Sequence, residues 1–265
     1  MIELDLRKTI LEEDGAGFEL HFQPVVDVET RRPTGCEALV RWHRAGYGRL
    51  IGPAEFIPIV EETGLIRQLG ELVLRRACAV AASWTGESLR LAVNVSPAQF
   101  RAPGLVQAVA EALSASGLDP HRLEIEITEG VLLDRTEETL AALHRLRALG
   151  VCLAMDDFGT GYSSLAYLRS FPFDRVKVDR SFVRDIEARA DDASIVRAVN
   201  DLCLELGMTT VAEGVESEGQ LRVIAAARCR EAQGYLFSRP VPAEQLPAVL
   251  ARLGRAALIP AEAAA

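Results

Sequence analysis

Short apolar runs alternate along the chain with longer stretches in which apolar residues recur every three or four positions. The short runs are typical of strands, which we expect at 89–95, 122–127, 151–156, 174–178, 208–212 and near 231–235. The longer stretches predict helices at 65–82, 103–116, 135–149, 190–206, 217–227 and 243–252. About seven units of a strand followed by a helix indicate an α/β fold with a mainly parallel sheet.

The beginning of the chain has a different pattern. Residues 3–13 have the spacing of a short amphipathic helix. Residues 18–28 then alternate between apolar and polar, a turn follows at 31–35, and a second strand is expected over 36–42. Strands joined by a short turn form a hairpin, so we expect the first two strands to be antiparallel.

Two architectures fit this order of elements, a (β/α)-barrel and a doubly wound open sheet. Val, Leu and Ile dominate the predicted strands, as they do where helices cover both faces of a sheet. Polar residues at several strand ends favour the barrel, because the carboxyl ends of barrel strands converge on one mouth. In an open sheet, residues from the outer strands would lie too far apart to share a site.

The clearest of these strand ends carries two adjacent carboxylates. Asp156 and Asp157 follow the apolar run 151–155, and burial of such charges is costly unless a cation or hydrogen bonds compensate them. The glycine-rich loop that continues to residue 165 is a candidate flap or phosphate cradle. The alternative is a turn with a helix cap at Ser163, which accounts for the glycines but not for both acids.

Other apolar runs also end in charged or ligand-type side chains, namely Glu37, Asn94, Glu126, Lys177 and Glu213. Glu37 shares a strand face with Arg41, although an exposed cross-strand ion pair would give the same pattern. Asn94 is a candidate oxygen ligand or the cap of the next helix. Lys177, between two valines, is either a cation near a reacting phosphate or a side chain that extends to the surface.

The strand that contains Glu126 raises a further question. Glu124, Glu126 and Thr128 share one face, and Glu129 ends the segment. We expect one of these three acids to be solvated or paired with a helix residue, and the alternative is that all three are structural. Gln233 ends the last short strand, where it contacts either a base edge or the backbone.

These residue types indicate a hard-cation site. Carboxylate and amide oxygens suit Mg²⁺ or Mn²⁺, no cysteine pair has zinc spacing, and the four histidines do not form a cluster. Two such ions about 3.5–4 Å apart would suit in-line hydrolysis of a phosphodiester. Lys177 and Arg41 would then offset charge on the phosphate.

Composition narrows the function further. The net charge of −9 and the pI of about 5.1 argue against a nucleic-acid polymer as partner, although bound cations allow an acidic protein to handle an anionic substrate. Five widely spaced cysteines indicate reduced thiols. No apolar run reaches the roughly 20 residues that span a bilayer, and the N-terminus lacks a signal peptide's apolar core. We therefore expect a soluble cytoplasmic protein.

Several ordered motifs carry a family resemblance: Gln23-Pro24, Glu37-Ala38-Leu39, Arg41-Trp42, PAEFIPIVEETGLI at 53–66, NVSPAQF at 94–100, EITE at 126–129, DDFGTGYSSL at 156–165, KVDRSF at 177–182, AEGVES at 212–217 and QGYLFSRP at 233–240. By these motifs, which cover roughly residues 3–252, the chain resembles the EAL-domain phosphodiesterases of bacterial cyclic di-GMP. The resemblance implies a modified TIM-like (β/α)₈ barrel whose first strand is antiparallel to the others. It also implies hydrolysis of cyclic di-GMP to linear pGpG in the biofilm and motility switch.

The resemblance also implies roles for individual residues. The metal ligands, for two Mg²⁺ or Mn²⁺ ions, would be Glu37, Asn94, Glu126, Asp156, Asp157 and Glu213. The catalytic residues would be Lys177, which positions or activates water, with Glu37, Asp156 and Asp157. The substrate contacts would be Gln23, Leu39, Arg41 and Gln233. Glu129 would hold the loop after Asp157 in a competent shape.

The resemblance finally implies an organisation. We expect an N-terminal helix over 1–14, the phosphodiesterase domain over 15–255 and a disordered tail over 256–265, with a homodimer and an upstream GGDEF or sensor domain as partners. The helix after the Asp157 loop is the expected dimer interface. Two departures, Ser217 where Thr is common and Arg228 where Gly is common, should not touch the metals. A weak cyclic di-GMP receptor and a protein-partner regulatory module are the alternatives, but the complete ligand set favours an active enzyme.

Overall fold

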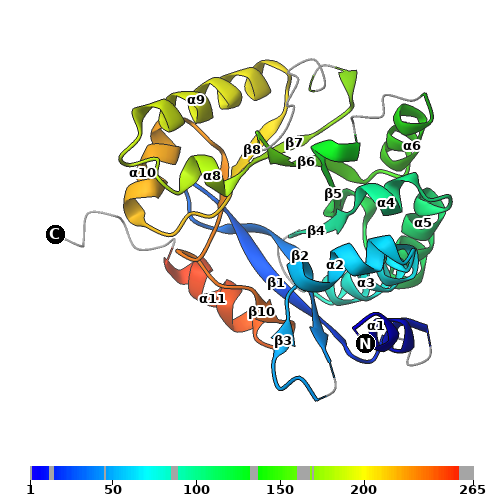
Figure 1. Cartoon of the computed structure of the whole chain (residues 1–265). Coiled ribbons are helices and arrows are strands. Elements are labelled where there is room, and N and C mark those ends of the chain that lie inside the picture. Colours follow the sequence, from blue (N-terminus) through cyan, green and yellow to red (C-terminus); the bar gives the residue numbers. More distant parts are fainter. Residues whose placement is uncertain are drawn as a thin grey trace.

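A computed structural model describes residues 2–11, 15–44, 46–84, 89–131, 137–159, 168 and 170–256. In this part of the chain, strands form a closed barrel that helices surround (Figure 1). Its walls are β1 (Phe18–Asp27), β2 (Pro33–His43), β4 (Arg90–Val95), β5 (Leu123–Thr128), β6 (Cys152–Phe158), β7 (Arg175–Val178), β8 (Thr209–Ala212) and β9 (Glu231–Gln233). The barrel predicted from the sequence is therefore confirmed, and the open sheet is wrong.

The order of the strands also confirms the expected hairpin. β1 pairs antiparallel with β2 on one side and with β9 on the other. From β2 through β4 to β9, each neighbouring pair of wall strands is parallel. Two-residue strands extend the sheet at β3 (Leu50–Ile51) and β10 (Val241–Pro242). The carboxyl ends of the parallel strands thus lie at one end of the barrel.

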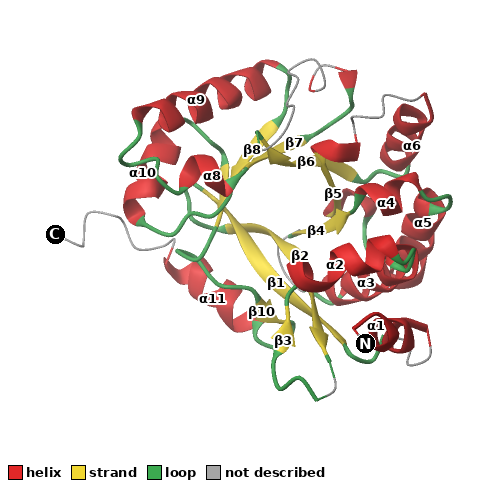
Figure 2. Ribbon diagram, viewed as in Figure 1, coloured by secondary structure: helices red, strands yellow, loops and turns green. Residues whose placement is uncertain are grey.

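Helices follow most of the parallel strands (Figure 2). They are α1 (Ile2–Leu11), α2 (Pro53–Glu62), α3 (Ile66–Ala82), α4 (Pro97–Arg101), α5 (Leu105–Ser116), α6 (Glu137–Ala148), α8 (Arg180–Val183), α9 (Ala190–Glu205), α10 (Glu218–Ala226) and α11 (Leu246–Ala256), with 3₁₀ turns η1 (Pro120–Arg122) and η2 (Glu129–Val131). None of the described helices is both long and apolar enough to cross a membrane.

The apolar core has two parts. The larger part lies between the barrel wall and the helices from α3 to α11. A smaller cluster lies where the N-terminal helix packs, and it includes Leu6 of α1, Trp42 of β2 and Phe56 of α2, none more than 1% exposed. The helix expected at the N-terminus is thus present over 2–11 and contributes to the core. The domain boundaries stay a prediction, and the tail over 257–265 lies outside the described residues.

Candidate active site

The polar strand ends predicted from the sequence meet at the mouth of the barrel. Parallel pairing aligns Asn94 of β4 with Glu126 of β5, and Thr128 of β5 with Asp156 of β6. Lys177 of β7 pairs with Val211, two residues before Glu213. Because successive inward positions of a strand are two residues apart, these side chains point into the same part of the barrel.

Lys177 lies at the centre of the group. Its side chain is only 2% exposed, and its Nζ lies 2.8 Å from Oε1 of Glu213, 2.9 Å from Oε2 of Glu126 and 3.1 Å from Oδ1 of Asp156. Oε1 of Glu37 is 3.8 Å away. The prediction that Lys177 extends to the surface is therefore wrong. Its ammonium is buried, and the carboxylates around it compensate its charge.

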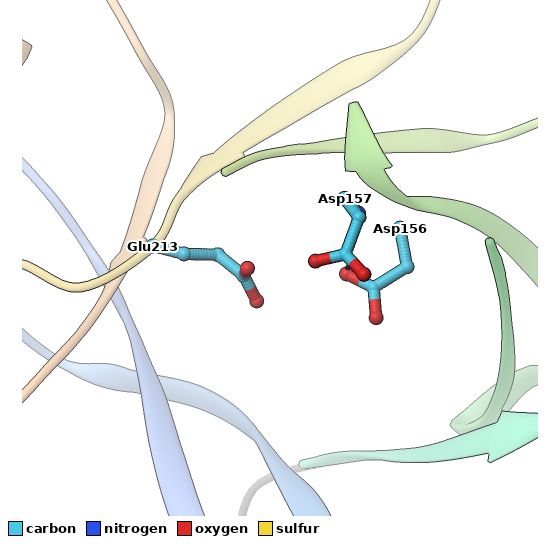
Figure 3. Close-up of side chains that lie close together, drawn as sticks. All are labelled: Asp156, Asp157 and Glu213. Carbon is cyan, nitrogen blue, oxygen red and sulfur yellow. Dashed lines mark hydrogen bonds between the residues drawn. The ribbon is translucent and has the colours of Figure 1, made fainter. Parts of the chain in front are cut away.

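An irregularity in β6 brings both aspartates to the site. The pairing of β6 with β7 shifts register between Met155 and Phe158, and Asp157 adopts a φ of 55°. In a regular strand the two side chains would point to opposite faces. Here carboxylate oxygens of Asp156, Asp157 and Glu213 all lie within 4.8 Å of one another, and the three carboxylates point toward a common space (Figure 3).

A second set of side chains forms a hydrogen-bonded chain around Glu37. Asn94 donates from Nδ2 to Oε1 of Glu37 at 2.6 Å, and Gln233 donates from Nε2 to Oε2 at 2.6 Å. Gln233 also donates from Nε2 to Oε1 of Gln23 at 3.1 Å, and Gln23 donates from its own Nε2 to the carbonyl of Ser238. These bonds fix the Glu37 carboxylate, while Ser96 rather than Asn94 caps α4.

The electrostatics of the site reflect burial of many acids around one cation. Burial raises the pKa of Glu126 well above its usual range, and burial and neighbouring acids raise the pKa of Glu213 to about 8 despite Lys177. Burial also raises the pKa of Asp157. Burial alone would raise the pKa of Glu37, but the charge of Lys177 and the hydrogen bonds from Gln233 and Asn94 outweigh burial and lower this pKa.

The pKa of Lys177 is also set by burial and by neighbouring charges, which act on it in opposite directions. Burial alone would lower its pKa, but Asp156, Glu126 and Glu213 together raise it well above the usual value. The ammonium is therefore charged, and it serves as the counter-charge of the acids.

The residues expected to contact substrate border the same mouth. Leu39 and Arg41 are half-buried on β2, and burial lowers the pKa of the Arg41 guanidinium. Beside them is a largely apolar cavity of about 440 Å³, which Leu39, Asn94 and residues of α2, α3 and α4 line. Its size is that of a small-molecule site.

The residue expected to hold the loop is also near the site. Glu129 is buried in η2, directly after β5 and beside β6. Residues 160–167 of the glycine-rich loop and residue 169 lie outside the described residues, so the contact proposed for Glu129 and the dimer interface stay predictions.

The prediction of a solvated acid over residues 124–129 is wrong, because Glu124, Glu126 and Glu129 are 5%, 2% and 6% exposed. Glu124 is neither solvated nor paired with a helix residue, because it is 5% exposed inside the barrel, 2.7 Å from Nε of Arg175 on β7. Arg90, Arg175 and Glu231, which complete this buried group, were not expected from the sequence. Their positions in the sequence could have indicated this group, because each lies two or four residues before a predicted site residue on the same strand.

The side chains fit a bound hard cation. Three carboxylates converge within 4.8 Å, which one ion can bridge. Oε2 of Glu126 is buried without a hydrogen bond of normal geometry, although it lies 2.9 Å from the Lys177 ammonium. The donors at the mouth are carboxylate and amide oxygens, the ligands that Mg²⁺ and Mn²⁺ prefer.

Comparison with known proteins finds relatives named as cyclic di-GMP phosphodiesterases. The chain is 44% identical over 244 residues to the cyclic di-GMP phosphodiesterase NbdA of Pseudomonas aeruginosa. The matched region covers 91% of this chain and 31% of NbdA. Across the first curated relatives, the chain spans only about a third of their length, 28–34%.

Solved structures agree in fold. The structure of the MucR phosphodiesterase of P. aeruginosa, described as a c-di-GMP complex, has a TM-score of 0.86 and 42% identity over 92% of this chain and 99% of that one. A manganese and cyclic di-GMP complex of Klebsiella pneumoniae BlrP1 has a TM-score of 0.77 and 33% identity over 86% of this chain and 57% of that one. The sequence profile described as EAL domain matches residues 4–240, and the chain therefore belongs to the EAL domain family.

Proposed function

We propose that this chain hydrolyses cyclic di-GMP to linear pGpG at the barrel mouth, with two Mg²⁺ or Mn²⁺ ions. The observation that carries the proposal is the convergence of five carboxylates on Lys177 and its neighbours. The relatives named above as cyclic di-GMP phosphodiesterases support the choice of substrate.

The charge balance supports two ions rather than one. When ionised, Glu37, Glu126, Asp156, Asp157 and Glu213 carry five negative charges, and Lys177 carries one positive charge, so the group has a net charge of −4. Two divalent cations would neutralise it. With one ion, a net charge of −2 would remain, so buried acids such as Glu126 and Glu213, whose pKa values are raised in the metal-free chain, would have to stay protonated.

The protein residues would divide the work of the reaction. Bound divalent cations supply Lewis-acid stabilisation of charge on the phosphodiester and its attacking water. Lys177, held by acids on three sides, is placed to orient that water or to offset charge that develops on the phosphate. Asn94 and Gln233 keep the Glu37 carboxylate in a single orientation.

The rim would bind the rest of the substrate. Arg41, half-buried near Glu37, is placed to pair with a phosphate, and Gln23 and Gln233 offer amide groups to phosphate or base. Leu39 and the apolar cavity of about 440 Å³ beside it provide room for a guanine base. In the cell, we infer a cytoplasmic role in the biofilm and motility switch, as a homodimer and with an upstream GGDEF or sensor domain.

The direct test is product analysis. We expect the chain with cyclic di-GMP and Mg²⁺ or Mn²⁺ to form pGpG, detected by chromatography, and to form none with EDTA. Asp156→Asn should bind metal weakly and lose at least about 10²-fold in turnover without loss of thermal stability. Tight binding of cyclic di-GMP without turnover would instead identify a receptor, and a near-parental rate for Asp156→Asn would contradict the metal-site assignment.

A further inference from the structure

A second charged layer lies inside the barrel below the mouth. It consists of Arg90 on β4, Glu124 on β5, Arg175 on β7 and Glu231 on β9, which we call the lower ring. Arg175 lies 2.7 Å from Glu124 through Nε and also pairs with Glu231 through Nη1. Arg90 Nη2 lies 2.5 Å from Glu231, and Arg90 Nε lies 4.0 Å from Glu124. The four charges therefore alternate in sign and sum to zero.

Stability alone is a weak explanation for this ring. The side chains of Glu124 and Glu231 are 7% and 5% exposed, so their desolvation cost is large. Buried ion pairs often contribute no more than apolar residues of the same volume. Barrel interiors are ordinarily filled by layers of Val, Ile and Leu. What an apolar layer lacks is charge pairing between strands. In this ring Arg90 and Arg175 both donate hydrogen bonds to Glu231, whereas Arg175 and Glu124 form an ion pair without hydrogen-bond geometry.

The ring connects strands that do not pair with one another. Glu124 and Arg175 join β5 to β7 across β6, and Arg175 and Glu231 join β7 to β9 across β8. Arg90 and Glu231 join β4 to β9, which β1 and β2 separate. These four strands carry Asn94, Glu126, Lys177 and Gln233 to the mouth.

The spacing along each strand links the ring to the site. Glu124 and Glu126, Arg175 and Lys177, and Glu231 and Gln233 are each two residues apart, and Arg90 and Asn94 are four apart. Each ring residue therefore lies on the same strand face as one residue of the mouth. Residues of both layers, among them Arg90, Glu124, Glu126 and Lys177, line one cavity of about 10 Å³, which is roughly the space of one water.

We propose that the lower ring positions Glu126 and Lys177 for cation binding and catalysis at the mouth. The ring residues touch neither substrate nor reacting atoms, so they act through the strands. The catalytic part of this proposal rests on the proposed function, whereas the cation-binding part does not.

The test uses the double variant Arg175→Met with Glu231→Met, which removes one positive and one negative charge. The two charges that remain, Arg90 and Glu124, lie 4.0 Å apart and still sum to zero, so we expect a thermal midpoint near that of the parent. We expect Mn²⁺ binding, followed by electron paramagnetic resonance of free Mn²⁺, to weaken about 10-fold or more, as for other residues that support metal ligands. For cyclic di-GMP, kcat should fall about 10-fold and KM should change less than about 3-fold.

Two further variants keep the test decisive. Arg49→Met with Glu55→Met removes an exposed pair of similar geometry, 2.7 Å apart, and should leave both Mn²⁺ affinity and kcat unchanged. If the ring double variant does not fold, Glu231→Gln removes the charge and preserves the side-chain shape, and it should still weaken Mn²⁺ binding several-fold. Parental Mn²⁺ affinity in a folded ring variant would overturn the proposal, as would a parent that binds no Mn²⁺. A parent that binds Mn²⁺ without turning over cyclic di-GMP would refute only the proposed function.

Discussion

Lys177 balances the charges at the barrel mouth. Its ammonium lies within 3.1 Å of three carboxylates and is almost fully buried. We expect Lys177→Met to lower turnover at least about 10²-fold. Without metal it should also destabilise the fold by about 3–5 kcal/mol, because it leaves buried acids uncompensated.

Thermal denaturation in EDTA and in excess Mg²⁺ measures this effect. The Lys177→Met variant should lose stability chiefly in EDTA, because divalent cations can replace the missing charge. Lys8→Met, at an exposed position of α1, is the matched control. If Lys177→Met and the parent had the same thermal midpoint in EDTA, Lys177 would not compensate the charge of the acids.

Glu213 gives the site a dependence on pH. The pKa of Glu213 is about 8 in the folded metal-free chain, above its ordinary value of 4.5. Because the pKa is raised on folding, its contribution to stability is present below about pH 4.5 and is lost as pH rises through about 8. A cation must displace the proton of this acid, so cation affinity should increase over the same range.

The rise in thermal midpoint caused by Mg²⁺ therefore ought to be larger near pH 9 than near pH 6. Equal Mg²⁺-induced shifts at the two values would mean that Glu213 is already ionised in the metal-free protein. The EDTA midpoint at each pH is the reference for this comparison.

At the scale of residues, the sequence indicated which acids belong to the site but not how they meet. Asp157 reaches the other carboxylates only because its φ is positive and β6 shifts register there, and alternation of residue types does not encode such a bulge. Arg228 also has a positive φ, 62°, which explains why Gly is common at this position of the family pattern. Its contact is with exposed Asp201, away from the mouth.

At the scale of elements, Gly234 shows how a loop fixes the end of β9. A Cβ at this position would lie 2.0 Å from the carbonyl oxygen of Val215. Gly234→Ala should therefore push β9 away from the segment around Val215 that follows β8, displace Gln233 and destabilise the fold by more than about 2 kcal/mol.

A matched glycine serves as the control for steric effects. Gly254 lies inside α11, and a Cβ there would meet nothing within 4 Å. Gly254→Ala should stabilise the chain by about 0.5–1 kcal/mol through helix propensity. Urea denaturation of both variants measures the two effects, and a Gly234→Ala variant as stable as the parent would contradict the close approach.

Periodicity predicted the wall strands and most helices within a few residues, because their apolar faces pack against one another. It did not predict α2, where Pro58 lies inside the helix and argues against one. The two-residue strands β3 and β10 are too short for any period. Three members of the lower ring, Arg90, Arg175 and Glu231, were missed because they lie at the opposite ends of the strands from the predicted site.

At the scale of the whole molecule, the chain combines a net charge of −9 with a proposed anionic substrate. The positive charges of Lys177 and Arg41 at the mouth are fewer than its five carboxylates. Bound cations are therefore the proposed means by which a phosphodiester approaches this surface. The relatives are about three times longer than this chain, so regulation by further domains and dimerisation stay predictions.

The number of divalent cations bound per chain tests the central claim most directly. We predict that titration with Mn²⁺ near pH 8, followed by electron paramagnetic resonance of the free ion, gives two sites per chain. Asp156→Asn should lose at least one of them. Saturation of the parent at one ion or none, or two sites retained in Asp156→Asn, would contradict the two-cation account of this barrel mouth.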